Sequence, residues 1–368
     1  MSVELPKDLL RPIIEQIEHP ATLCTLSLCC TEFRDEAQRF LFREPTSACT
    51  PMHIHHKFLD AIIASPDRLA LWVRSYTQHL PSVCPHMDAG TSLIVFGIFA
   101  ALQEKSAFGL GIMTNLKRLD YASIYNSSPA ATILRGCTFQ LEVLHWGCPF
   151  DEEELFQHFL PTQPGLKHLS LPAIVETKAQ LSPPPPSVCP NLESLYVGPK
   201  AAVALLQGRM VKRLRVDAAI LFIPRMPEVA RELSRIKCYV HPDAETALVV
   251  GDSCPNLTHL EVGLQPFVWA KNDPTGDVMT TLVTLRLLPH ITVLVFSQDA
   301  GIDRPFLDES QRRRVAWIAF GISRSLLHVD ISADGDSYTR YFPAANREVS
   351  SQIDGLSASV IQSWHIAA

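Results

Sequence analysis

The stretch CPNLESLYV, residues 189–197, decides the fold. Its residues Leu192, Leu195 and Val197 follow the frame apolar-x-x-apolar-x-apolar, and Cys-Pro-Asn-Leu returns at residues 254–257 before a second such frame. Apolar residues at alternate positions are typical of a strand with one buried face. The proline ends any preceding helix, and the asparagine suits a turn. The stretch therefore predicts a short strand that follows a turn.

The same frame recurs along the body of the chain at a nearly regular interval. The first five copies start 25, 25, 26 and 19 residues apart, and the later gaps are 46, 34 and 35 residues. We expect a decayed copy around Ile236 to Val240 in the longest gap. A period of roughly 20 to 29 residues is typical of stacked strand-and-helix repeats, so the spacing predicts an α/β fold with a parallel sheet. The copies are Leu116/Leu119/Tyr121, Leu141/Leu144/Trp146, Leu166/Leu169/Leu171, Leu192/Leu195/Val197, Val211/Leu214/Val216, Leu257/Leu260/Val262, Ile291/Leu294/Phe296 and Leu326/Val329/Ile331.

The outward positions of these strands form the expected ligand-binding row. In each copy, the residues that flank the central apolar position point away from the shared core. They mix basic, aromatic and acidic groups, which suits a protein partner better than a polyanion, and Arg and Tyr are enriched at binding hot spots. The alternative is that they are merely soluble sheet positions. The residues expected to bind a protein ligand are Arg118, His145, His168, Tyr196, Arg213, Arg215, His259 and Glu261, in a row that also holds Asp120, Val143, Ser170, Ser194, Val293, Val295, His328 and Asp330.

Three short helices are predicted in the N-terminal segment. Its first apolar stripe recurs at steps of four residues, which places it on one face of a helix. A second apolar stretch follows Pro20, and Thr31 is the expected N-cap of a third helix. Three helices in about forty residues bury little surface, so part of the stripe should be covered by another protein or by the rest of the chain. The stripe consists of Leu9, Ile13 and Ile17, widened by Leu10 and Ile14.

This N-terminal pattern resembles the F-box, in the version common in large fungal families. The resemblance implies that the Leu-Pro pair and the apolar face of the first helices bind a Skp-type adaptor, which links to the cullin scaffold of a ubiquitin ligase. The alternative is a helical cap on the repeat array. The matching residues are Leu5-Pro6, Leu9, Ile13-Ile14, Ile17, Leu23, Leu26, Leu28-Cys29, Phe33-Arg34 and Leu41-Phe42-Arg43. The implied adaptor contacts are Leu5, Pro6, Leu9, Ile13, Ile17, Leu23 and Leu26.

The phrase Cys-Pro-Asn-Leu is frequent in leucine-rich F-box proteins, so the resemblance extends over the repeats and implies an irregular leucine-rich-repeat solenoid. Residues 1–43 are then the F-box, and residues 44–110 are a helical linker with helices expected at 58–63 and 91–105 and a candidate degenerate first strand at Trp72 to Tyr76. Residues 111–331 form the repeat array. Residues 332–368 form a C-terminal cap or tail, with a capping helix or a loosely held end at 349–366.

Composition argues against several classes of function. The chain has 368 residues, of which 47% are hydrophobic and 19% charged, so it is long enough for one elongated domain or two compact ones. A formal net charge of -6 disfavours nucleic acid, and the basic run Arg312 to Arg314 reads as a solvated helix face. Pro183 to Pro186 predicts a polyproline II loop or, alternatively, a ligand for a proline-binding domain.

Targeting signals are not recognisable either. Glu4 and Pro6 stand where the apolar core of a signal peptide would begin, which predicts a cytoplasmic or nuclear protein. The longest apolar run, residues 93–102, is too short to span a membrane and is expected to be a buried helix. In a reducing compartment the 10 cysteines are expected to be small core residues.

The sequence shows no strong metal or catalytic pattern. His53, His55 and His56 lie close to Cys49, but they lack a matched second pair of zinc ligands. Asp330 to Asp336 lacks the spacing of a calcium loop and predicts a solvated turn. We therefore expect no cofactor and no enzyme activity, with an enzyme whose site comes from distant residues as an alternative. The expected function is a non-catalytic substrate receptor, and its main rival is an interaction scaffold without a role in ubiquitin transfer.

Overall fold

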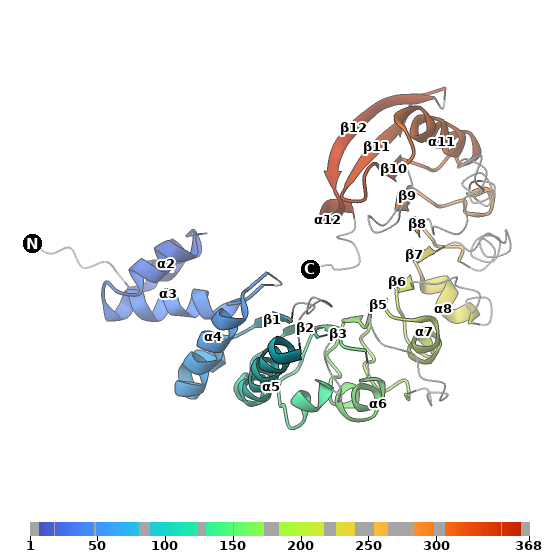
Figure 1. Ribbon diagram of the computed structural model, residues 1–368. Helices are drawn as coiled ribbons and strands as arrows, with labels where there is room; N and C mark the ends of the chain where they lie inside the picture. The colour runs from blue at the N-terminus through green and yellow to red at the C-terminus, as the bar shows by residue number, and fades with distance from the viewer. Residues whose placement is uncertain are drawn as a thin grey trace, which may run out of the picture. The chain divides into compact units, whose positions relative to one another are not determined.

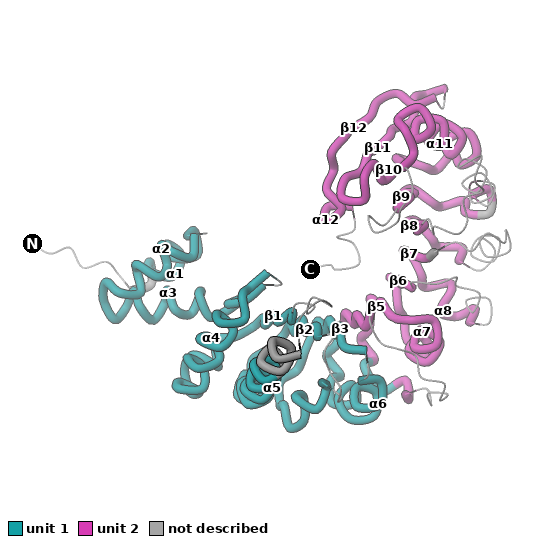
Figure 2. The backbone as a smooth tube through the Cα atoms, viewed as in Figure 1, with its two compact units in different colours: residues 1–166, 173–175, 187–189 teal, residues 167–172, 176–186, 190–368 magenta. Residues whose placement is uncertain are grey.

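The computed structural model has a mixed α/β fold that is built on an open, mostly parallel sheet of 12 strands (Figure 1). The chain divides into two compact units, one of residues 1–166, 173–175 and 187–189 and the other of residues 167–172, 176–186 and 190–368 (Figure 2). The structure describes residues 7–17, 19–47, 49–80, 89–123, 130–149, 151–172, 184–216, 226–239, 254–263, 282, 285–297, 306–346 and 348–361.

Unit 1 holds the N-terminal helices and the first three strands. Helices α4 and α5 contact each other, and α5 also contacts the short helix η2. The elements are α1 (Lys7–Glu15), α2 (Pro20–Leu26), α3 (Thr31–Arg43), α4 (Met52–Ala64), η1 (Pro66–Ala70), β1 (Ser75–His79), α5 (Ala89–Ile112), β2 (Arg118–Ala122), η2 (Ala130–Leu134), β3 (Val143–Gly147), α6 (Glu152–Glu154), η3 (Leu155–Phe159) and η4 (Leu160–Thr162).

Unit 2 holds the remaining strands, with helices α7 and α8 along one side of β5 to β7 (Figure 1). Strands β4 to β10 run parallel, and β10 to β12 are antiparallel. The elements are β4 (His168–Ser170), β5 (Ser194–Tyr196), α7 (Pro199–Leu206), β6 (Arg213–Val216), α8 (Pro227–Glu232), β7 (Arg235–Tyr239), β8 (His259–Gly263), η6 (Leu285–Leu287), β9 (Val293–Ser297), α11 (Glu309–Ile322), β10 (His328–Ser332), β11 (Ser337–Pro343), β12 (Val349–Ser357) and α12 (Ala358–Ile361).

The predicted strand frame is confirmed in every copy. All of its apolar residues are buried, and each copy supplies one strand from β2 to β6 or from β8 to β10. The decayed copy expected near Ile236 is β7, in which Ile236 and Cys238 are buried. The entry turn repeats as well: the backbone N–H groups of Glu193 and Ser194 donate to the Lys167 carbonyl, and those of the next strand donate in turn to the Glu193 carbonyl.

The first strand lies later than the sequence indicated. Trp72 to Tyr76 was expected as a strand, but β1 begins at Ser75. The sequence pattern missed the true position because the frame of this strand ends in the polar residue Gln78 and not in an apolar one. The Gln78 side chain is buried, and its Oε1 accepts hydrogen bonds from the hydroxyls of Tyr76 and Ser106. A polar side chain can occupy a core position when its partners come from within the core.

A capping helix or a loosely held end was expected over residues 349–366, and the helix alternative was wrong for residues 349–357, which form β12. This strand pairs with β11, and Tyr338 of that hairpin packs with Val295 and Ile361. Val293 also packs against this cluster, so the hairpin covers two outward positions of the expected ligand-binding row. The predicted solvated turn also begins too early. Asp330 is buried in β10 and accepts two hydrogen bonds from the Arg340 guanidinium, at 2.7 and 2.8 Å.

Three short helices at the N-terminus agree with the prediction. The buried side chains of Ile14, Leu23 and Ala37 form a small core that joins α1, α2 and α3. The predicted N-cap was one residue off, because Cys30 is the extended capping residue and Thr31 is the first helical residue. This core is too small to support a domain alone, so contacts with the rest of unit 1 matter.

Helix α3 is attached to the rest of unit 1 through Trp72. The guanidinium carbons of Arg39 and Arg68 lie 5.9 and 5.4 Å from the centre of the Trp72 ring. Arg68 also donates to Asp35 and Gln38 of α3, at 3.2 and 2.9 Å. Cations stacked on an aromatic face attract its negative π cloud, so Trp72 fixes α3 against the chain between α4 and β1.

The proline run packs against its own chain. Arg209 is buried, and its guanidinium donates to the carbonyls of Pro184 and Pro185, at 3.3 and 2.9 Å. Pro183 lies outside the described residues. Because two carbonyls of the run are bound within unit 2, the arrangement favours the loop interpretation over a ligand for another domain.

His55 makes unit 1 sensitive to acid. Its side chain is fully buried on α4, and burial lowers its pKa to about 4, with the nearby Thr50 backbone opposing the shift and His56 and His79 adding to it. The stability that depends on neutral His55 is complete above pH 6.5 and is lost as the pH falls toward 4. By linkage the loss approaches roughly 3 kcal/mol below that pH.

We expect His55→Leu to flatten the decline in stability between pH 6.5 and 4, measured as urea unfolding at a series of pH values. The matched control is His53→Leu, because His53 is exposed on the same helix. A decline of equal steepness in the two variants would show that His55 does not carry the acid sensitivity.

Candidate functional site

The helix α1 exposes one apolar face and buries another. Leu9 and Ile13 are 49% and 46% exposed, whereas Leu10 and Ile14 are 5% and 0% exposed. Residues one position apart point about 100° apart around a helix, so the wide predicted stripe divides into a core-facing pair and a solvent-facing pair. Large apolar side chains that remain exposed side by side are typical of a surface that another protein covers.

The other predicted adaptor contacts occupy different environments. Leu5 and Pro6 lie outside the described residues. Leu23 is buried in the small N-terminal core, and Ile17 and Leu26 are half-buried against it. Leu28 belongs to the recognised pattern but not to the predicted contacts, and it is 87% exposed. Within the part of the chain that the structure describes, Leu9 and Ile13 therefore present the predicted apolar face.

In unit 1 the outward face of the sheet carries a histidine and aspartate cluster. Asp120 on β2 accepts from His79 Nε2 at 2.7 Å, and its Oδ1 lies 3.8 Å from His145 Nε2 on β3. The hydrogen bond to Asp120 raises the pKa of His79, and burial partly opposes that shift. Sequence reasoning found His145 and Asp120 but missed His79, because β1 was placed three residues too early. Arg118 lies half-buried at the start of β2.

In unit 2 the predicted residues of β4 to β6 lie close together. The guanidinium of Arg215 stacks 3.9 Å from the Tyr196 ring centre, and Nη2 of Arg213 lies 3.2 Å from His168 Nδ1. The strand register places Ser194 between His168 and Arg213. All four predicted side chains are partly exposed, so this part of the row can be reached from solvent.

At β8 the expected ligand-binding row loses one of its predicted residues. Glu261 was expected to contact a ligand, but it is 0% exposed and its carboxylate lies 2.6 Å from Nζ of the buried Lys237 on β7. His259 is half-buried. Burial lowers its pKa to about 3, with the positive charges of Arg235, His328 and Arg340 adding to the shift. His259 is therefore neutral at physiological pH.

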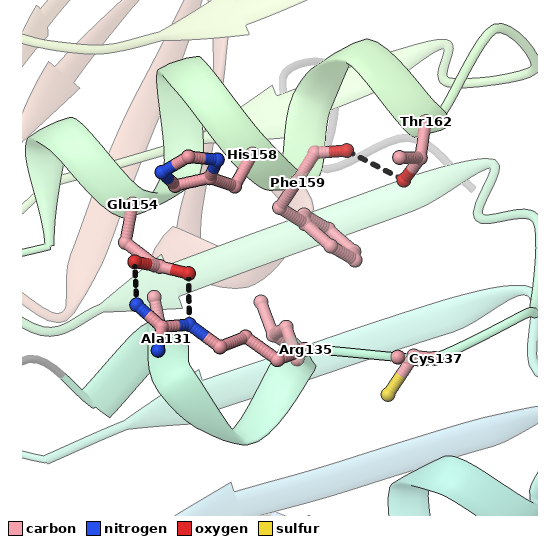
Figure 3. Close-up of a pocket in the computed structure, with 9 residues that line it drawn as sticks. Ala131, Arg135, Cys137, Glu154, His158, Phe159 and Thr162 are labelled. Atoms are coloured by element: carbon pink, nitrogen blue, oxygen red, sulfur yellow. Dashed lines mark hydrogen bonds and ion pairs between the residues drawn. The ribbon is translucent and has the colours of Figure 1, made fainter.

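A pocket of about 290 Å³ lies on the helical side of unit 1 (Figure 3). Its charged groups bind each other, since the Arg135 guanidinium donates twice to Glu154 at 2.6 Å. The Thr162 hydroxyl donates to the Phe159 carbonyl. Burial raises the pKa of the Cys137 thiol to about 12, so it is not a thiolate at neutral pH. The pocket is therefore a crevice between short helices whose polar groups already have partners within it.

Among the described residues, no group of three or more His, Cys, Asp or Glu side chains is arranged to hold a metal ion. Burial also raises the pKa of the Cys238 and Cys254 thiols to about 12. No helix in the described part of the chain has the length and hydropathy needed to cross a bilayer.

Comparison with known proteins does not identify a family. The sequence matches no protein-family model and no curated protein. The function must therefore be inferred from the exposed face of α1 and from the outward face of the strands.

Proposed function

We propose that the chain is a non-catalytic substrate-recognition subunit of a cullin-type ubiquitin ligase. In this proposal the N-terminal helices act as an F-box that binds a Skp-type adaptor. The strands and helices that follow act as an irregular leucine-rich-repeat array that binds a target protein. The main support for the proposal is the exposed pair Leu9 and Ile13. The core of the helical bundle is already formed by Leu10 and Ile14, so a second apolar face on the same helix is best explained by contact with another protein.

Two further features support the proposal. Strands β1 to β3 and β4 to β10 pair in parallel in chain order, and β2 to β6 and β8 to β10 each contribute the same buried frame, which is the arrangement that stacked repeats adopt. Trp72 and the two arginines beside it attach α3 to the rest of unit 1. A firmly attached adaptor-binding domain is useful to a receptor, because ubiquitin transfer depends on the proximity of the target to the ligase machinery. The proposed location is the cytoplasm or the nucleus, where that machinery works.

The adaptor-binding proposal predicts the effect of charging the exposed face. We expect Leu9→Asp combined with Ile13→Asp to abolish co-purification of the full chain with a Skp-type adaptor, because two carboxylates would have to be buried in an apolar interface. Both side chains are largely exposed, so the free protein should keep its circular dichroism spectrum and unfolding midpoint.

The control is Leu327→Asp, which charges an exposed leucine of unit 2 and should leave co-purification unchanged. Failure of the unmodified chain to bind the adaptor, or unchanged binding by the double variant, would contradict the proposal. Recovery of the adaptor without any cullin would instead favour an interaction scaffold.

A further inference from the structure

Helix α5 of unit 1 presents an apolar face to solvent. Phe108 and Ile98 are 59% and 40% exposed, and Ala101 is exposed between them. The space beside Gly97 and Gly111 is open: outside α5 itself, no described atom lies within 4 Å of the position that a β-carbon would take on either glycine. These five residues lie on one side of the helix, since successive residues are rotated by roughly 100°, and we call them the outer α5 face.

The opposite side of α5 is buried. Phe99, Leu102 and Leu110 are 6%, 0% and 0% exposed. The helix is apolar nearly all round, and Glu104 and Lys105 are its only charged residues. A helix that is apolar all round is normally enclosed on every side, whereas unit 1 encloses α5 on one side only. The outer α5 face is therefore expected to be covered by a partner.

The order of residues on this face is self-complementary. In an antiparallel helix pair with two-fold symmetry, a residue before the axis lies opposite the residue that is equally far beyond the axis in the other copy. When the axis passes between Glu104 and Lys105, every large apolar residue lies opposite a small one, so the two helices can approach closely. The opposed apolar pairs are Phe108 with Ala101, Ile98 with Gly111 and Ile112 with Gly97.

The charges obey the same symmetry. Glu104 is exposed, and Lys105 Nζ contacts Asp60 on α4 at 2.7 Å. Asp60 is 63% exposed, so this ion pair is weak and leaves Lys105 able to attract a second carboxylate. In the antiparallel arrangement, Glu104 of each copy lies opposite Lys105 of the other. A parallel arrangement would instead place Glu104 against Glu104 and Phe108 against Phe108, so charge and shape both favour the antiparallel one.

We propose that the outer α5 face binds the same face of a second copy of this chain, with the two α5 helices antiparallel and the two-fold axis between Glu104 and Lys105. The contact extends over residues 97–112, a length of about 24 Å. A single helix pair is a small interface, so we expect a reversible dimer that forms at micromolar concentrations of the chain. This association goes beyond the proposed function and does not depend on it.

The first test is sedimentation equilibrium of the full chain at concentrations from about 1 to 200 µM, a range that brackets micromolar dissociation constants. We expect a monomer–dimer equilibrium that Phe108→Glu weakens roughly tenfold or more, because the substitution would bury a carboxylate against Ala101 of the second copy. Phe108 is largely exposed in the single copy, so the variant should keep the circular dichroism spectrum and the unfolding midpoint.

The matched control is Met210→Glu, because Met210 is a 63% exposed apolar residue of unit 2. It should leave the equilibrium unchanged. A chain that stays monomeric over the whole range, or equal weakening by Phe108→Glu and Met210→Glu, would overturn the inference. So would a monomeric chain that binds the adaptor through Phe108, because the face would then belong to the adaptor.

A charge exchange tests the arrangement of the two helices. Glu104→Lys and Lys105→Glu should each weaken self-association roughly tenfold, because the symmetry doubles every like-charge contact. An equimolar mixture of the two variants should recover association, because one copy then contributes two positive charges and the other two negative charges. The unfolding midpoint of each variant is measured alongside. A mixture that associates no better than either variant alone would contradict the proposed pairing.

Discussion

Trp146→Ala is expected to lower the free energy of unfolding by about 4 kcal/mol, the range found when a large buried aromatic side chain is removed. Trp146 is fully buried on β3 and stacks on Tyr121, with ring centres 4.9 Å apart. Its indole N–H donates to Asp151 at 2.8 Å. The substitution therefore creates a cavity and also removes one hydrogen-bond donor from a buried carboxylate whose pKa is already raised by burial.

The measurement is urea unfolding of the full chain followed by far-ultraviolet circular dichroism. Trp317→Ala is the control, because Trp317 is 53% exposed on α11 and its loss should change stability by less than about 1 kcal/mol. Trp146→Phe keeps an aromatic ring but lacks the N–H, so it should fall between the two. Equal losses for Trp146→Ala and Trp317→Ala would show that Trp146 does not organise the core of unit 1.

The strands were predictable because the constraint on them is local and repeated. Each copy of the frame must bury three apolar side chains at fixed spacing, and the same requirement returns with every strand. This is why even the decayed copy at Ile236 could be located inside a long gap. The three N-terminal helices were predictable for a similar reason, since Pro20 and the apolar spacing mark their limits.

The errors occurred where a residue's environment depends on distant parts of the chain. Gln78 completes a strand frame only because Ser106, on α5, supplies a hydrogen-bond partner within the core. Helical spacing grouped Leu9 with Leu10, but the positions of α2 and α3 decide which of them is buried. The hairpin of β11 and β12 carries no copy of the frame. The half-buried residues of β12, Val349, Gln352 and Leu356, are three and four positions apart, so periodicity alone did not distinguish β12 from a helix.

The sequence predicted which strand positions form the candidate binding face. It did not predict which charged residues on that face remain exposed. Arg213 and Arg215 were recognised as outward residues, and Arg235 was not, because the decayed copy lacked a defined frame. Glu261 was correctly placed on a strand, yet its ion pair with Lys237 removes it from the surface. Whether an outward residue is exposed depends on the strand beside it, and neighbouring parallel strands in this fold start 19 or more residues apart in the sequence.

Breaking this ion pair is expected to have the second large effect. In Lys237→Met the fully buried Glu261 carboxylate loses its counter-ion, 2.6 Å away, and the free energy of unfolding should fall by roughly 3 to 5 kcal/mol at neutral pH. The measurement is again urea unfolding by circular dichroism.

The double variant, Lys237→Met with Glu261→Met, decides whether the loss of stability in Lys237→Met comes from the unpaired charge or from altered packing. Methionine has a volume close to that of both side chains, so the double variant keeps the packing and removes the need to desolvate two ions. We therefore expect it to recover most of the loss, which makes the two substitutions strongly non-additive. Losses that simply add would mean that each side chain stabilises unit 2 through its own packing. In that case the ion pair itself would not contribute to stability, and the effect of replacing Glu261 would not depend on whether Lys237 is present.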